Sequence, residues 1–270
     1  MRHLINKIIV LVAAFLGTLT INASAQLFLE KGKESVTVSG GEHLNGSLIL
    51  HNTATKEANI KVYWEDFTYK APYDGTKEFL AAGTTPTTAA SWVTFAPQTF
   101  SMPAKGQQTI DYTIAVPASI KEGHYGVLFF EQAPEAMSSE KGVSLIVRVG
   151  CLFFIEPNNK VKKALLQDVV LKQDRLSVNF VNQANVVLIP HTTYYIMEQG
   201  GVVVHRGDVK RLYVPPGATG SVVIPLTKKL TAGHYTMVIN GDMEDGDIVV
   251  KEIGLAVDAA GQITIESTQD

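Results

Sequence analysis

The side chains of this 270-residue chain that could take part in catalysis or metal binding are scattered. None of the interior histidines is spaced from another histidine, or from the single cysteine, as zinc ligands are; these histidines are His43, His51, His124, His191, His205 and His234. No nucleophile elbow, phosphate-binding loop or HExxH pattern occurs. We therefore expect no catalytic residue, no metal and no cofactor, and a protein that is not an enzyme.

One acidic stretch, GDMEDGDIVV, is the strongest candidate for a metal site. It places four carboxylates around a glycine, namely Asp242, Glu244, Asp245 and Asp247 around Gly246. Calcium prefers such oxygen ligands, but the glutamate that closes an EF-hand loop is missing. An Asp-Gly pair between two apolar runs is typical of a hairpin turn. The pattern favours a turn, and a metal-assisted hydrolase built on this loop is the enzyme alternative.

A second stretch, YKAPYDGTKEF, places Tyr69, Tyr73 and Phe79 around an Asp-Gly pair. Aromatic side chains on a loop can form a platform for a glycan or a peptide. They can equally fasten a long loop onto the body of the protein, and the sequence leaves both interpretations open.

The only cysteine, Cys151, lies in the apolar run RVGCLFFIEP. A chain with one cysteine forms no intramolecular disulfide. The apolar neighbours of Cys151 predict a buried, unreactive thiol.

The elements that must position all these residues are strands. Short runs rich in Val, Ile, Thr, Tyr and Phe alternate with clusters of Gly, Pro, Asn and Asp, as in ESVTVSGGE, NIKVYWEDFTY and QTIDYTIAVP. Strands at this spacing, with these turn residues, are typical of β-sandwiches. Trp64 and Trp92 are expected to lie in or near a core.

The second half of the chain repeats the layout of the first. FSMPAKGQQTIDYTIAVPASIKEGHYGVLFF and LYVPPGATGSVVIPLTKKLTAGHYTMVING both contain a Pro-Gly loop, an apolar strand, and a loop that ends in Gly-His-Tyr before another strand. This repeat predicts an all-β fold of two tandem immunoglobulin-like β-sandwich domains, residues 26–157 and 158–270. Tyr125 and Tyr235 are either tyrosine corners, with the hydroxyl bonded to upstream backbone, or ordinary core tyrosines.

Residues 1–25 have the pattern of a cleaved signal peptide. Arg2 and Lys7 precede an apolar run, and Ala23-Ser24-Ala25 matches a signal peptidase site. We expect a periplasmic or secreted protein, without a transmembrane segment after cleavage because no later run is long and apolar enough. The net charge of −3 makes nucleic acid an unlikely partner.

The stretch FFEQAPEAMSSEKGVSLIVRVGCLFFIEP reads as a strand, a polar loop and a long apolar strand that ends at Pro157. It resembles the last hairpin of the first domain of PapD-like periplasmic pilus chaperones. LEKGKESVTVSGGE resembles their first strand. The resemblance implies two immunoglobulin-like domains and donor-strand complementation, in which an edge strand of the first domain fills the groove of an incomplete pilin sandwich. The positions that match the family's donor residues are Val143, Leu145 and Val147.

The same family holds the carboxyl terminus of its subunit with two cations between the domains. Lys33 matches the cation on the first strand, whereas the second falls at Leu152, so half of this anchor is missing. The resemblance implies a secreted or periplasmic β-protein subunit as partner, bound along residues 142–149 during pilus or surface-subunit assembly. An ordinary core strand would show the same alternation of apolar residues.

A weaker resemblance leads to an alternative function. The region from VYWEDFTY to GHYGVLFF is similar to the first domain of WxL-interacting surface proteins of Gram-positive bacteria. That similarity implies a surface-associated adhesion protein that binds peptidoglycan or protein, with the aromatic loop from Tyr69 to Phe79 as its contact.

Overall fold

The structure is a computed structural model, and it describes residues 27–133, 146–172, 174–226, 229–244 and 248–270. The expected signal peptide, two of the expected donor residues (Val143 and Leu145) and two carboxylates of the acidic stretch (Asp245 and Asp247) lie outside the described residues. The described part is all-β, with eighteen strands and no helix, which confirms the predicted fold class. It contains no helix that could cross a membrane.

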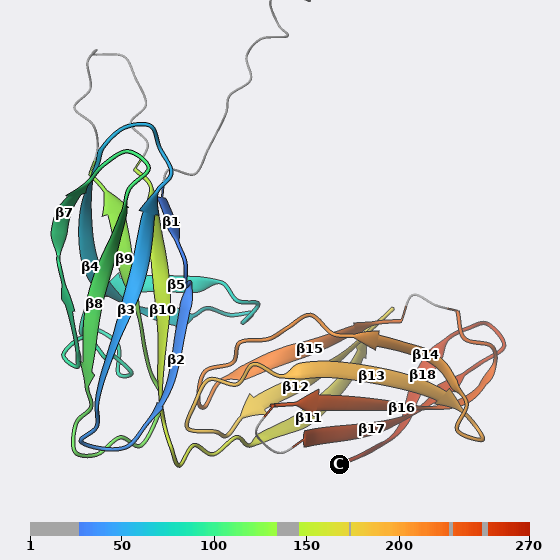
Figure 1. The fold of residues 1–270 in the computed structure, drawn as a ribbon. Coiled ribbons are helices and arrows are strands. Elements are labelled where there is room, and N and C mark those ends of the chain that lie inside the picture. The colour runs from blue at the N-terminus through green and yellow to red at the C-terminus, as the bar shows by residue number, and fades with distance from the viewer. Residues whose placement is uncertain (1–26, 134–145, 173, 227–228, 245–247) are drawn as a thin grey trace, which may run out of the picture.

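The first sandwich consists of strands β1 to β10 in two sheets (Figure 1). One sheet has the order β1-β3-β8-β6, formed by Leu27–Leu29, His43–Asn52, Gln107–Ala115 and Val93–Ala96. The other has the order β2-β10-β9-β4-β5, formed by Lys33–Val38, Arg148–Pro157, His124–Gln132, Ala58–Tyr69 and Lys77–Ala81, and β7 (Thr99–Met102) also pairs with β4.

The second sandwich consists of strands β11 to β18. Its three-stranded sheet has the order β11-β12-β15, formed by Ala164–Lys172, Arg175–Asn182 and Thr219–Pro225. Its five-stranded sheet has the order β14-β13-β16-β17-β18, formed by Val203–Asp208, His191–Glu198, Gly233–Asp242, Ile248–Val257 and Ile263–Gln269. Figure 1 shows the two sandwiches in an L-shaped arrangement, with the loop between β4 and β5 extending toward the second one.

The core of the first sandwich forms because alternate residues of each strand face the opposite sheet. Along β4, Ile60, Val62 and Trp64 point inward and are buried, as the sequence predicted for Trp64. On the neighbouring strand β9, a Cβ at Gly126 would lie 1.9 Å from the indole ring of Trp64. Position 126 must therefore be glycine for the indole of Trp64 to pack directly against the backbone of β9.

Asp66 on β4 is a completely buried carboxylate that holds a long loop in place. One of its oxygens accepts hydrogen bonds from the Trp64 indole N–H (3.2 Å) and the Thr88 hydroxyl (2.7 Å). The other accepts from the backbone N–H groups of Thr84 (2.9 Å) and Thr85 (3.0 Å) and from the Thr85 hydroxyl (3.1 Å). Five donors therefore compensate the burial of one negative charge.

Cys151 on β10 is fully buried, as predicted from its apolar neighbours. Burial, as the largest effect, raises the pKa of its thiol to about 12. Because only the thiolate reacts rapidly, we expect the native protein to resist Ellman's reagent at pH 8 and to show one reactive thiol per chain after unfolding in guanidinium chloride. A thiol that reacts within minutes in the native protein would contradict this burial.

Candidate functional site: the free edge of β10

The strand β10 has a neighbouring strand on both sides along its second half, but on only one side along its first half. It pairs with β9 from Arg148 to Ile155, whereas its parallel pairing with β2 begins only at Leu152. Among the described strands, none pairs with the preceding residues of β10 on the β2 side. Residues 148–151 therefore form an open sheet edge.

The backbone direction along this edge follows from two hydrogen bonds. The N–H of Leu152 donates to Gly32 on the β2 side (3.0 Å), and the N–H of Gln132 on β9 donates to the carbonyl of Val147 (3.0 Å). Backbone groups alternate in direction along a strand. The N–H and C=O groups of Arg148 and Gly150 thus point to the free side, as an added strand requires.

The side chains of β10 alternate between the two faces of the sheet. Val149, Cys151 and Phe153 belong to the core, so Arg148 and Gly150 lie on the outer face. Of the three expected donor residues, the structure describes only Val147, which is half-buried and has the parity of the core residues. Its neighbour Ile146 has the opposite parity and is 52 % exposed.

Arg148 fixes the start of β10 on the outer face of the sheet. Its guanidinium lies 4.1 Å from the ring centroid of Phe129 and contacts the Glu65 carboxylate (3.3 Å) and the Tyr63 hydroxyl (3.2 Å). The Tyr63 hydroxyl in turn donates to Glu131 (2.6 Å). These contacts raise the pKa of Arg148, with the hydrogen bond to Tyr63 as the largest cause. The free edge therefore begins at a firmly held residue.

Gly150 is required by the same packing. A Cβ at this position would lie 2.7 Å from the Val127 side chain and 2.9 Å from the Phe129 ring. Both side chains lie against the backbone of Gly150 and are themselves buried.

Lys33 and Leu152, the two positions matched to the family's cation pair, are register partners between β2 and β10. The Lys33 side chain is exposed, and its Nζ lies 4.2 Å from the ring centroid of Phe154. Among the described residues, no carboxylate pairs with Lys33. The neighbouring Leu152 is apolar, so this location has one cation and an apolar surface beside it.

Phe154 leads into a hydrophobic cluster where the two sandwiches meet. The buried members of this junction cluster are Phe67, Tyr69, Tyr125, Phe154 and Val187, with Tyr73, Leu152, Ile189 and Tyr213 packed against them. The hydroxyl of Tyr125 accepts a hydrogen bond from the backbone N–H of Val187 (2.8 Å), and the N–H of Gly123 donates to the carbonyl of Asn185 (2.9 Å). Backbone and aromatic contacts together join the sandwiches.

The two Gly-His-Tyr segments consequently differ in their roles. The hydroxyl of Tyr235 donates to the upstream carbonyl of Thr231 (2.9 Å), which confirms a tyrosine corner in the second sandwich. The same prediction is wrong for Tyr125, because its hydroxyl bonds across the junction instead. A Cβ at Gly123 would lie 2.1 Å from that hydroxyl, so glycine is needed there for close approach.

The loop between β4 and β5 is fastened to the second sandwich. The carbonyl of Tyr73 accepts a hydrogen bond from the N–H of Tyr213 (2.8 Å), and Lys210 pairs with Asp74 (3.2 Å). Tyr69 stacks on Tyr213 with ring centroids 5.0 Å apart.

The three aromatic residues of the predicted loop therefore have different surroundings. Tyr69 is only 5 % exposed, Tyr73 is half-buried, and Phe79 is 38 % exposed with its ring against Phe129. A glycan or peptide platform built from all three would need a ring face that Tyr69 does not expose.

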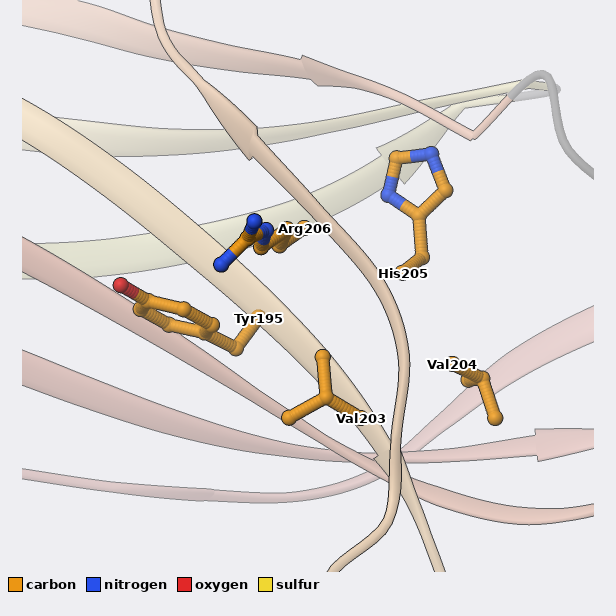
Figure 2. A pocket seen from close by; sticks show the side chains of 5 residues that line it. All are labelled: Tyr195, Val203, Val204, His205 and Arg206. Carbon is orange, nitrogen blue, oxygen red and sulfur yellow. The ribbon is translucent and has the colours of Figure 1, made fainter.

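A hollow of about 360 Å³ lies on the edge strand of the five-stranded sheet. Figure 2 shows that Tyr195, Val203 and Arg206 lie on one side of β14, whereas Val204 and His205 lie on the other. These side chains do not converge on a common point. Within the described part of the chain, no group of three His, Cys, Asp or Glu residues is arranged to hold a metal ion.

Comparison with known proteins identifies the fold through solved structures alone. No protein-family model matches the chain, and no curated protein sequence matches it. A chain from the structure of a chaperone–tip adhesin complex of CFA/I fimbriae biogenesis is 12 % identical, with a TM-score of 0.51 over 84 % of this chain and 97 % of that one. The class 5 fimbriae chaperone CfaA is 13 % identical, with a TM-score of 0.51 over 83 % and 97 %. The predicted fold of two tandem β-sandwiches is confirmed by these structures.

Proposed function

We propose that this protein is a non-enzymatic, periplasmic or secreted chaperone that binds a β-protein subunit by strand addition along the free edge of β10. The observation that carries the proposal is the set of backbone groups at Arg148 and Gly150, which point to a side of the sheet without a described partner. Main-chain hydrogen bonds would supply affinity, and Val143, Leu145 and Val147 would fill pockets of the partner.

The fold supports the proposed class of partner. One of the two structures with the same fold comes from a complex of a chaperone with a tip adhesin, and the other is a fimbriae chaperone. By analogy, the partner of this chain is an exported subunit whose sandwich lacks a strand. The class of partner is thus inferred from the similarity of fold, whereas the mechanism of strand addition is inferred from the free edge of β10.

The surroundings of Lys33 modify the expected anchoring of that subunit. Lys33 would attract the partner's terminal carboxylate alone, since Leu152 lies beside it where a second cation would stand. One exposed cation contributes little binding free energy, about 1 kcal/mol or less. We therefore propose that strand pairing and apolar contacts dominate binding, with Lys33 as a minor contributor.

Capture of the partner from the native envelope fraction tests this proposal. We expect the wild-type chain to retain a small exported β-protein, and Leu145→Glu to lose it because a charge cannot fill an apolar pocket. Ile146→Glu is the matched control, since it carries the same charge on the opposite face of the strand and should retain capture. Equal capture by all three chains would move the binding site away from this edge.

A further inference from the structure

A pocket of about 300 Å³ lies between the two sandwiches, apart from the free edge of β10. Its residues come from the end of β4, the loops at 86–87 and 122 and Tyr125 on β9 in the first sandwich, and from residues 187 and 215–216 in the second. It contains none of residues 146–152. Small-molecule sites commonly lie between domains and have volumes from about 300 Å³ upward.

The floor of this pocket is aromatic and already formed. Phe67, Tyr69 and Tyr125 line it, and their rings hold one another: Phe67 meets Tyr69 edge-on at 5.6 Å and Tyr125 at 6.1 Å between centroids. The neighbouring walls include Pro215 and Pro216, whose backbones have little freedom. An apolar ligand would therefore meet a prepared surface and would order few side chains.

The charge at this pocket has one sign. Glu122 is the one ionisable acid or base, apart from the tyrosines, among the described lining residues, and its side chain is exposed. No ion pair joins Glu122 to another described residue. Lys77 contacts the rings of Tyr69 and Tyr213 (5.1 and 5.9 Å to the centroids), but it does not line the pocket.

The other carboxylate near Tyr125, that of Glu156, forms an ion pair with Lys160 (3.3 Å), so Glu122 is the carboxylate that can attract a cationic ligand. The pKa of Tyr125 is raised mainly by burial, and Glu122 is the smallest of the causes. An apolar floor beside the carboxylate of Glu122, unpaired among the described residues, favours a ligand that is apolar at one end and cationic at the other.

We propose that this junction pocket binds a small organic cation with an apolar body, such as an arylalkylamine, with the ring against Pro86, Pro215 and Pro216 above the buried aromatic floor and the ammonium near Glu122. The ligand would contact both sandwiches and so stabilise their mutual arrangement. The pocket contains no residue of the free edge of β10, so ligand binding at the pocket can be tested independently of the proposed chaperone function.

A titration with three ligands of matched size tests the charge preference. The probes are 2-phenylethylamine, the neutral 2-phenylethanol and the anion phenylacetate, followed by NMR shifts of the backbone amides around Tyr125 and Val187. We expect a dissociation constant on the order of 1 mM for the amine, at least about fivefold weaker binding of the alcohol, and no saturable binding of the anion. Equal binding of all three, or no binding of the amine, would overturn the proposal.

Three variants locate the site. Glu122→Gln should weaken amine binding about fivefold and leave the alcohol unchanged, and it should fold normally because the replaced side chain is exposed. Lys121→Gln, an exposed neighbour outside the pocket, should not weaken amine binding. Thr87→Phe should fill the pocket and abolish binding of both ligands. Unchanged amine affinity in Glu122→Gln or in a folded Thr87→Phe protein would place the ligand elsewhere.

Discussion

Replacing Ile146 with proline is expected to weaken binding of the β-protein partner about 100-fold while leaving the first sandwich folded. The N–H of Ile146 has the same parity as those of Arg148 and Gly150, so it points to the free side of the strand. Proline removes this donor and places its ring where an added strand must lie. The fold tolerates the change because pairing with β9 runs through Val147, whose carbonyl accepts the N–H of Gln132.

Titration calorimetry with the purified subunit measures this effect. Ile146→Ala is the matched control: it removes the same exposed side chain and retains the N–H, so its affinity should stay within about threefold of wild type. Wild-type affinity in a folded Ile146→Pro protein would show that the partner does not pair with this edge.

Replacing Asp66 with alanine is expected to destabilise the first sandwich by about 3–5 kcal/mol. The change leaves the indole N–H of Trp64 and the backbone N–H groups of Thr84 and Thr85 without their acceptor. Because these donors are buried or partly buried, water cannot fully replace the carboxylate. Asp66→Asn should also destabilise, since its amide turns a donor toward other donors.

Both tryptophans of the chain, Trp64 and Trp92, lie in the first sandwich, so tryptophan fluorescence during urea unfolding reports on that sandwich. Asp111→Ala is a suitable control, because Asp111 is an exposed aspartate on β8 of the same sandwich, and its loss should change stability by less than about 0.5 kcal/mol. A free energy of unfolding for Asp66→Ala within 1 kcal/mol of wild type would contradict the role assigned to the Asp66 network.

The strands were predictable from the sequence, whereas the pairing of Lys33 with Leu152 was not predicted: the two positions were matched only to the cation pair of a similar family. Alternating apolar residues and turn residues are local signals for strands, but the register in which Leu152 of β10 lies opposite Lys33 of β2 is seen only in the structure. The free edge itself was only partly predictable, because the point at which β2 stops pairing with β10 depends on where the chain leaves one sheet for the other.

The junction between the sandwiches was not predictable in the same way. The bond from Val187 to Tyr125 joins residues 62 positions apart, and no local pattern distinguishes it from the tyrosine corner that Tyr235 forms. Likewise, Asp66 looks like an ordinary strand carboxylate in the sequence, since four of its five donors reach it only when the loop that follows β5 folds back onto β4.

The most direct test of strand addition is amide hydrogen exchange of β10 in the free protein and in its complex with the subunit. The N–H groups of Val149 and Cys151 face β9 and should be protected in both states, which makes them internal references. Those of Arg148 and Gly150 should exchange rapidly in the free protein and at least about 100-fold more slowly in the complex. If Arg148 and Gly150 exchange at the same rate in both states, the partner does not bind by adding a strand to this edge.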